Sequence, residues 1–224
     1  DNLVNESLQG VFSYTNFGHA LAGMILSELT HSSFERAMDS IVLTPLEMSA
    51  TTYDIDSARL TDHSAAHKNG KIVKHVYTYP LIRPSASMFS NIIDLGRFAE
   101  CLLNDGKYKG KQIFPEEVIT QMFTGYIPLG TGHNYFGYPN SRYNYSLISF
   151  QYNAIDFVGH PGESTSQNTL FAMAKDYNTT FIIMSNTGFY PFIKTFELLA
   201  DTYLPTKNTS QNKNQTKPAL SEYT

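Results

Sequence analysis

The sequence predicts an α+β protein in which a helix-rich first half precedes an antiparallel sheet and a closing helix. Apolar residues recur at helical spacing in the first half, whereas short runs rich in Phe, Ile, Val and Tyr alternate with turn formers after residue 145. One amphipathic segment, residues 191–204, follows these runs. We assign residues 1–205 to one domain, with a helical subdomain at about 14–125 and a sheet with its closing helix at about 135–205. An α/β sandwich beside a helical subdomain is the closely related alternative.

The first predicted helix begins after a candidate cap at Asn16 and runs to about Thr30. Its apolar residues recur at spacings of three and four, which is typical of a helix with one apolar face. These residues are Phe17, Leu21, Met24, Ile25 and Leu29.

Three further helices follow in the first half. A capping box of Ser32 and Glu35 predicts a second helix, which must end near Thr44 because proline follows. A third helix is expected from about residue 91 to residues 104–106. Pro115, with acidic residues behind it, opens a fourth. The residues from 50 to 84 are predicted to be rich in loops.

The second half reads as strands and one helix. The predicted strands are residues 145–152, 154–159, 168–174 and 180–186. The last two are expected to form an antiparallel hairpin, with 169–174 against 180–185. Residues 191–204 form the closing helix. The polar stretch 206–224 has too little apolar surface to offset the entropy of ordering, so we predict a disordered tail there.

Composition excludes several classes of protein. The chain has 16 Lys and Arg against 20 Asp and Glu, a net charge of -4, which argues against a nucleic-acid partner. No run of eighteen apolar residues exists, so we predict no transmembrane segment in this chain. The one cysteine, Cys101, leaves no internal disulfide and no cysteine-based metal cage.

The first candidate site lies at the entrance of the first helix, where Tyr14 and Asn16 are two residues apart. A phenol near cations can shuttle a proton, and an amide can orient a substrate carbonyl or a lysine. The alternative is a core tyrosine followed by an ordinary helix cap.

The second candidate site is the segment 158–163, which reads Val-Gly-His-Pro-Gly-Glu at the end of a predicted strand. His160 can hold a charge or pass a proton, Gly162 permits close approach of a ligand, and the Glu163 N–H can serve as an oxyanion donor. A plain strand-end turn is the alternative.

His63 and His67 have a four-residue spacing that would suit a metal on a helix. The segment lacks the glutamate of a zinc-protease motif, and no third ligand is evident. We therefore interpret both as surface histidines and predict no metal and no cofactor, with a metal-dependent protein as the remote alternative.

Taken in order, these motifs resemble those of the serine β-lactamase-like proteins, the family of class C β-lactamases, D-alanyl-D-alanine peptidases and related esterases. The resemblance covers roughly residues 9–204. Its landmarks are Tyr-Thr-Asn at 14–16, Pro-Leu-Glu-Met at 45–48, the small-residue turn 84–90, and Gly-His-Pro-Gly at 159–162 followed by 185–188.

The resemblance implies acyl transfer by a serine nucleophile. Tyr14 would be the proton shuttle and Asn16 the orienting amide. His160 would replace the cation of the family's Lys-Thr-Gly strand. Gly162 and Glu163 would bind the substrate, with the Glu163 N–H as half of the oxyanion hole.

Two kinds of departure stand against this resemblance. Glu47 occupies a position where the family prefers glycine, and Glu163 one where a small residue is commoner. The nucleophile motif Ser-x-x-Lys should precede Tyr14, yet its one match is Ser210 to Lys213 in the polar tail, which we reject as coincidence. The chain is then either the C-terminal part of a longer hydrolase or a protein that has lost its nucleophile.

The leading interpretation is a serine hydrolase acting on peptide, ester or lactam carbonyls of a small molecule or peptide. An N-terminal segment or separate chain would complete the domain, and without it the strands of residues 145–186 should show an unpaired edge and an uncovered apolar face. The alternative is an inactive binding protein for peptidoglycan-like peptides. The resemblance favours a periplasmic or secreted location.

Overall fold

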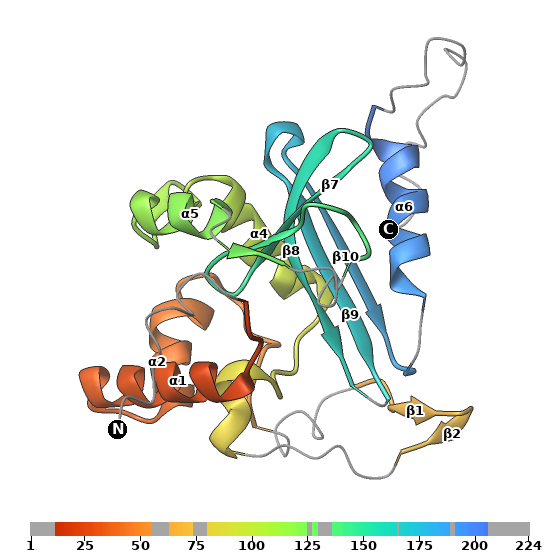
Figure 1. Cartoon of the computed structure of the whole chain (residues 1–224). Helices are drawn as coiled ribbons and strands as arrows, with labels where there is room; N and C mark the ends of the chain where they lie inside the picture. Colours follow the sequence, from red (N-terminus) through yellow and green to blue (C-terminus); the bar gives the residue numbers. More distant parts are fainter. Residues whose placement is uncertain are drawn as a thin grey trace, which may run out of the picture.

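The computed structural model describes residues 12–54, 63–73, 80–124, 127–129, 136–164, 166–188 and 191–205. Helices from the first half lie beside a twisted antiparallel sheet, and one helix closes the chain (Figure 1). The predicted α+β class is therefore confirmed. The predicted tail at 206–224, with the Ser210–Lys213 match, lies outside the described residues.

The described helices are of three kinds, α, π and 3-10. The α-helices are α1 (Asn16–Thr30), α2 (Phe34–Met38), α4 (Ile92–Leu103), α5 (Glu116–Phe123) and α6 (Phe192–Tyr203). A π-helical turn, η2 (Asp39–Leu43), continues α2, and the 3-10 turns are η3 (Pro80–Ser85) and η4 (Lys175–Tyr177).

The main sheet has six antiparallel strands in the order β10-β9-β8-β7-β6-β5. Its strands are β5 (Ile127–Pro128), β6 (Arg142–Tyr143), β7 (Ile148–Tyr152), β8 (Ile155–Glu163), β9 (Asn168–Ala174) and β10 (Thr179–Ser185). Two small hairpins, β1 (His67–Lys68) with β2 (Lys71–Ile72) and β3 (Lys107–Tyr108) with β4 (Lys111–Gln112), form separate two-stranded sheets.

The register of the last hairpin confirms the sequence prediction. Residue pairs run from Thr179 opposite Ala174 to Ser185 opposite Asn168. Within the described part of the chain, β10 is one edge of the sheet, with β5 at the other, and it pairs on one side alone. The expected unpaired edge is therefore present.

The core lies on both faces of the sheet, between helices α6 and α4 (Figure 1). Successive residues of β8 alternate between these layers, as the two-residue period of a strand requires. Phe157 packs edge-on against Phe196 of α6, with ring centroids 5.0 Å apart. Val158 instead joins the cluster that contains Leu102 of α4. Burial of these large side chains supplies most of the driving force for packing.

Two predicted helix caps are wrong by one residue. Thr15, not Asn16, caps α1, because its hydroxyl accepts the Phe17 N–H at 3.1 Å. Ser33, not Ser32, caps the next helix. The expected capping box of Ser32 and Glu35 is absent, because the Ser33 hydroxyl accepts the Arg36 N–H; Glu35 forms an ion pair with Arg83 instead. Adjacent hydroxyl residues offer equivalent acceptors, and the backbone entering the helix selects one of them.

Helix α1 packs through its small residues and leaves its apolar stripe exposed. Ala20 and Gly23 are buried, and a Cβ added to Gly23 would lie 2.1 Å from a side-chain carbon of Pro84 in η3. The apolar stripe of α1 is five residues that are about half to three-quarters exposed: Phe17 70%, Leu21 48%, Met24 60%, Ile25 52% and Leu29 75%. The sheet does not show the uncovered apolar face that we expected, because α4 and α6 lie against it. The exposed apolar face is instead on α1.

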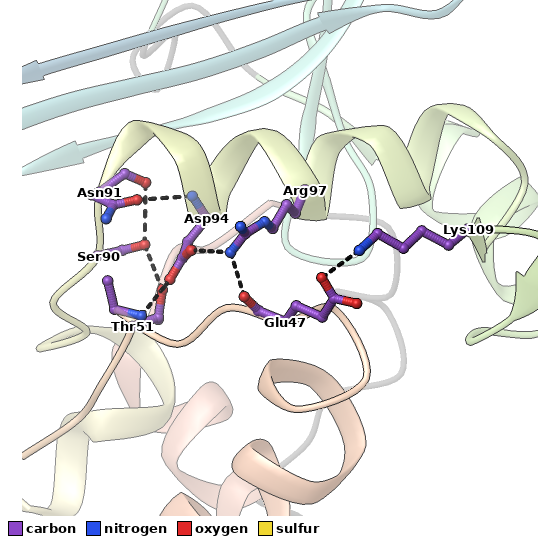
Figure 2. A network of polar contacts seen from close by, with 8 residues as sticks. Glu47, Thr51, Ser90, Asn91, Asp94, Arg97 and Lys109 are labelled. Atoms are coloured by element: carbon purple, nitrogen blue, oxygen red, sulfur yellow. Dashed lines mark hydrogen bonds and ion pairs between the residues drawn. The ribbon is translucent and has the colours of Figure 1, made fainter.

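A buried carboxylate joins the turn before residue 52 to the start of α4 (Figure 2). Asp94, at 2% exposure, accepts hydrogen bonds from the Ala50 N–H and the Thr51 hydroxyl, each at 2.9 Å. Arg97 donates a third at 2.9 Å and also bonds the Glu47 carbonyl. Three donors satisfy a charge that would otherwise be costly to bury.

Glu47 adopts the left-handed conformation, with φ of 56°, within this network. Its carboxylate pairs with Lys109 at 2.5 Å (Figure 2). A positive φ explains why glycine suits this position and why glutamate there is a departure.

Candidate active site

Tyr14 and His160 face each other at the junction of the helical part and the sheet. Tyr14 precedes α1, and His160 lies in β8. Their ring centroids are 6.1 Å apart and their planes are inclined by 28°. The structure therefore brings together the two residues on which the predicted site depends.

Two more aromatic rings surround Tyr14. Tyr143 of β6 meets it edge-on, at 6.5 Å and 90°. Phe12 lies 5.1 Å from Tyr143 and 6.4 Å from Tyr14, between ring centroids. Edge-to-face aromatic pairs hold a definite geometry, so this aromatic group positions the phenol.

Burial favours the neutral form of His160, at the position that the resemblance gives to a cation. Burial lowers the pKa of His160 below its usual 6.5; a hydrogen bond to the Pro161 carbonyl acts against this shift, and the charge of His19 adds to it. Nδ1 lies 2.6 Å from that carbonyl oxygen, which accepts only, so Nδ1 carries the hydrogen. The neutral ring therefore presents Nε2 as a hydrogen-bond acceptor.

Asn16 is the first residue of α1 and its side chain is exposed. Because Thr15 caps the helix, the amide of Asn16 is not used as the cap. Its proposed role as an orienting amide stays a prediction.

The glycines of β8 are explained by its neighbour β9. A Cβ on Gly159 would lie 1.9 Å from the Phe171 carbonyl oxygen, and one on Gly162 would lie 2.4 Å from the Thr169 hydroxyl oxygen. Glu163 ends the strand, exposed, opposite Asn168. The substrate-binding roles of Gly162 and Glu163 stay predictions.

Sequence reasoning missed a histidine and a serine beside this site. His19 of α1 and Ser146, in the turn between β6 and β7, approach to 2.8 Å between Nε2 and Oγ. They are 127 residues apart in the chain, and neither lies in a recognisable motif. No local signal predicts such a pair.

Of the two histidines considered for a metal, His67 takes part in backbone pairing. His67 forms part of β1, and its backbone N–H donates to the Asn186 carbonyl at 2.7 Å. Among the residues that the structure describes, no group of three His, Cys, Asp or Glu side chains could hold a metal ion.

An open polar groove of about 480 Å³ lies elsewhere, between the end of α4 and the β3–β4 hairpin. Glu100, Asp105, Lys107 and Lys109 contribute to its lining, which contains none of the predicted site residues. The groove is therefore separate from the Tyr14–His160 contact.

Comparison with known protein families shows to which family this chain belongs. The sequence model of the family described as Beta-lactamase matches residues 5–202. The chain is a member of the β-lactamase family. It therefore has the scaffold of the serine β-lactamases and the penicillin-binding-protein-like hydrolases.

Solved structures share this fold, among them the octameric penicillin-binding protein homologue from Pyrococcus abyssi, with a TM-score of 0.70 and 23% identity. The match covers 84% of this β-lactamase-family chain and 42% of that one, so the present chain spans less than half of its length. A comparison with curated proteins finds no match. Among the described residues, no helix has the length and apolarity needed to cross a membrane.

Proposed function

We propose that this chain is the C-terminal portion of a serine hydrolase that acts through an acyl-enzyme on peptide or ester carbonyls, with β-lactams less favoured. The nucleophilic serine and its lysine would come from a segment outside residues 1–224. The contact between Tyr14 and His160 is the observation that carries the proposal.

In this mechanism the Tyr14 phenol relays the proton of the attacking serine. His160 accepts a hydrogen bond at Nε2 instead of supplying positive charge, because its lowered pKa leaves it neutral. A neutral imidazole offers no ion pair to a substrate carboxylate. This supports esters, and peptide bonds away from a C-terminal carboxylate, over β-lactams, whose carboxylate is commonly bound by a cation.

Two exposed features support a completing segment. The apolar stripe of α1 is the kind of surface that monomeric proteins rarely leave open. Among the described residues, β10 has no partner strand on its outer side, so this edge offers backbone groups to a further strand. The solved relative also has more than half of its chain beyond the matched region.

The missing catalytic groups predict how active residues 1–224 are without a completing segment. Removing one oxyanion donor lowers turnover on the order of a hundredfold or more, and removing the nucleophile lowers it much further. We therefore expect this chain alone to be nearly inert toward peptides and unactivated esters.

Labelling of the protein isolated from its natural source tests the proposal. A fluorophosphonate should label a serine of a Ser-x-x-Lys motif outside residues 1–224, located by peptide mapping. Tyr14→Phe should slow this labelling strongly, whereas Tyr177→Phe, which changes an exposed tyrosine away from the site, should not.

Two results would contradict the hydrolase. One is a natural protein of 25.2 kDa by intact mass with no partner. The other is labelling unaffected by Tyr14→Phe. An intact longer protein that takes no label but binds peptidoglycan-like peptides would instead support the inactive binding protein.

A further inference from the structure

The tip of the β6–β7 hairpin places a serine where reagents can reach it. The Asn144 N–H donates to the Leu147 carbonyl at 2.8 Å, which leaves Tyr145 and Ser146 as the two residues of a tight turn. Ser146 has φ of 61° and an exposed side chain. A positive φ is unusual for a residue other than glycine.

An imidazole from a distant helix meets this hydroxyl. His19 Nε2 lies 2.8 Å from Ser146 Oγ, and His19 Nδ1 lies 3.5 Å from the Thr15 carbonyl oxygen. Because a carbonyl oxygen accepts only, Nδ1 is the nitrogen that carries hydrogen in the neutral ring. Nε2 is then free to accept the Ser146 proton. The close contact between Ser146 Oγ and His19 Nε2 is the one that a serine nucleophile and its base require.

The pair joins the two segments that carry the aromatic group around Tyr14. His19 reaches back to the carbonyl of Thr15, the residue after Tyr14. Ser146 is three residues beyond Tyr143, whose ring centroid lies 6.5 Å from that of Tyr14. The proposed function does not use this pair.

We propose that Ser146 and His19 form a second nucleophilic pair that takes the acyl group of activated esters. Ser146 Oγ forms a bond to the carbonyl carbon while its proton passes to His19 Nε2. The bond from that carbon to the alcohol oxygen then breaks. The departing alkoxide takes the proton from His19 or leaves as a stabilised anion. The product is an ester of Ser146, and water can hydrolyse it to restore the serine. No oxidant or other reactant is required.

The test uses the 224-residue chain itself with p-nitrophenyl acetate. Intact mass should rise by a single acetyl group, and peptide mapping should place that group on Ser146. Ser146→Gly suits the positive φ and removes the hydroxyl, so it should abolish this adduct while circular dichroism stays unchanged. His19→Gln keeps a polar group but removes the base, and should slow labelling at least about tenfold.

Ser149→Ala is the matched control. Ser149 lies on the neighbouring strand and bonds a backbone carbonyl, not an imidazole, so its loss should leave the labelling rate unchanged. Equal labelling of the original chain and Ser146→Gly, or no adduct at all on the original chain, would overturn the nucleophilic pair. Either result leaves the proposed hydrolase standing, because its serine lies outside this chain and its label maps to a different peptide.

Discussion

The rings of Tyr14 and His160 lie face to face, with centroids 6.1 Å apart, although one precedes the first helix and the other lies in the third-last strand of the main sheet. This contact joins the helical part of the chain to the sheet. It also places a phenol beside a histidine whose pKa is lowered by burial.

The stability of the protein should decline as the pH falls below about 6.5 because of His160. The pKa of His160 in the folded protein lies below the ordinary value of 6.5, so the unfolded chain binds a proton at a pH where the folded chain does not. The contribution is therefore complete above 6.5 and is lost as the pH falls toward the folded-state pKa. Urea unfolding at a series of pH values measures it.

His160→Gln is the control for this pH dependence. Glutamine does not titrate, so the free energy of unfolding of the variant should vary less between about pH 7 and pH 5 than that of the original chain. A parallel pH dependence in both proteins would show that His160 is not the cause.

Gly159→Ala should destabilise the protein strongly. The new methyl group would lie 1.9 Å from the Phe171 carbonyl oxygen and 2.8 Å from the Ala172 Cα, and backbone atoms of a central strand cannot move aside cheaply. We expect a loss of about 3 kcal/mol or more in the free energy of unfolding, measured with urea.

Gly96→Ala provides the matched comparison. Gly96 lies within α4, and nothing lies within 4 Å of an added Cβ. Alanine favours helix, so this change should stabilise the protein by about 0.5–1 kcal/mol. Equal effects of the two substitutions would contradict the close approach of β8 and β9.

Asp94→Asn should weaken the joint between the turn at residues 47–51 and α4. The substitution removes the charge that Arg97 meets at 2.9 Å and one acceptor of the bonds that fix Thr51. We expect a loss of about 2–4 kcal/mol by urea unfolding.

Asp156→Asn is the control for that loss. Asp156 is exposed and bonds Gln151 at 3.0 Å, so its substitution should change the free energy of unfolding by less than about 0.5 kcal/mol. If Asp94→Asn were equally harmless, the buried network would not stabilise the fold.

The apolar stripe of α1 should tolerate polar residues in this chain. The double variant Phe17→Ser, Leu29→Ser changes side chains that are 70% and 75% exposed, so it should keep its free energy of unfolding within about 1 kcal/mol and should reduce self-association in light scattering. Phe196→Ser, at 0% exposure, should by contrast cost about 3–5 kcal/mol. A large loss from the double variant would show that the stripe is packed within the chain.

Local signals predicted most elements of this fold. The residue pairs of the β9–β10 hairpin, the start of α4 at its Asn91 cap and the closing helix follow the sequence patterns closely. Helices and hairpins depend on bonds between residues near in the chain, which is why patterns within a short window predict them. The errors of one residue at the caps arise where neighbouring hydroxyl residues are chemically equivalent.

The short motifs at residues 14–16 and 159–162 pointed to Tyr14 and His160, whose rings the structure brings together. Sequence patterns and motifs predicted the class of the fold, the order of its elements, and Tyr14 and His160 as candidates. The packed structure was needed to see that burial lowers the pKa of His160, that His19 contacts Ser146, and that α1 packs through its small residues. The physical reason is that burial and contacts between distant segments depend on how the whole chain packs, whereas helical and strand periods are properties of a few consecutive residues.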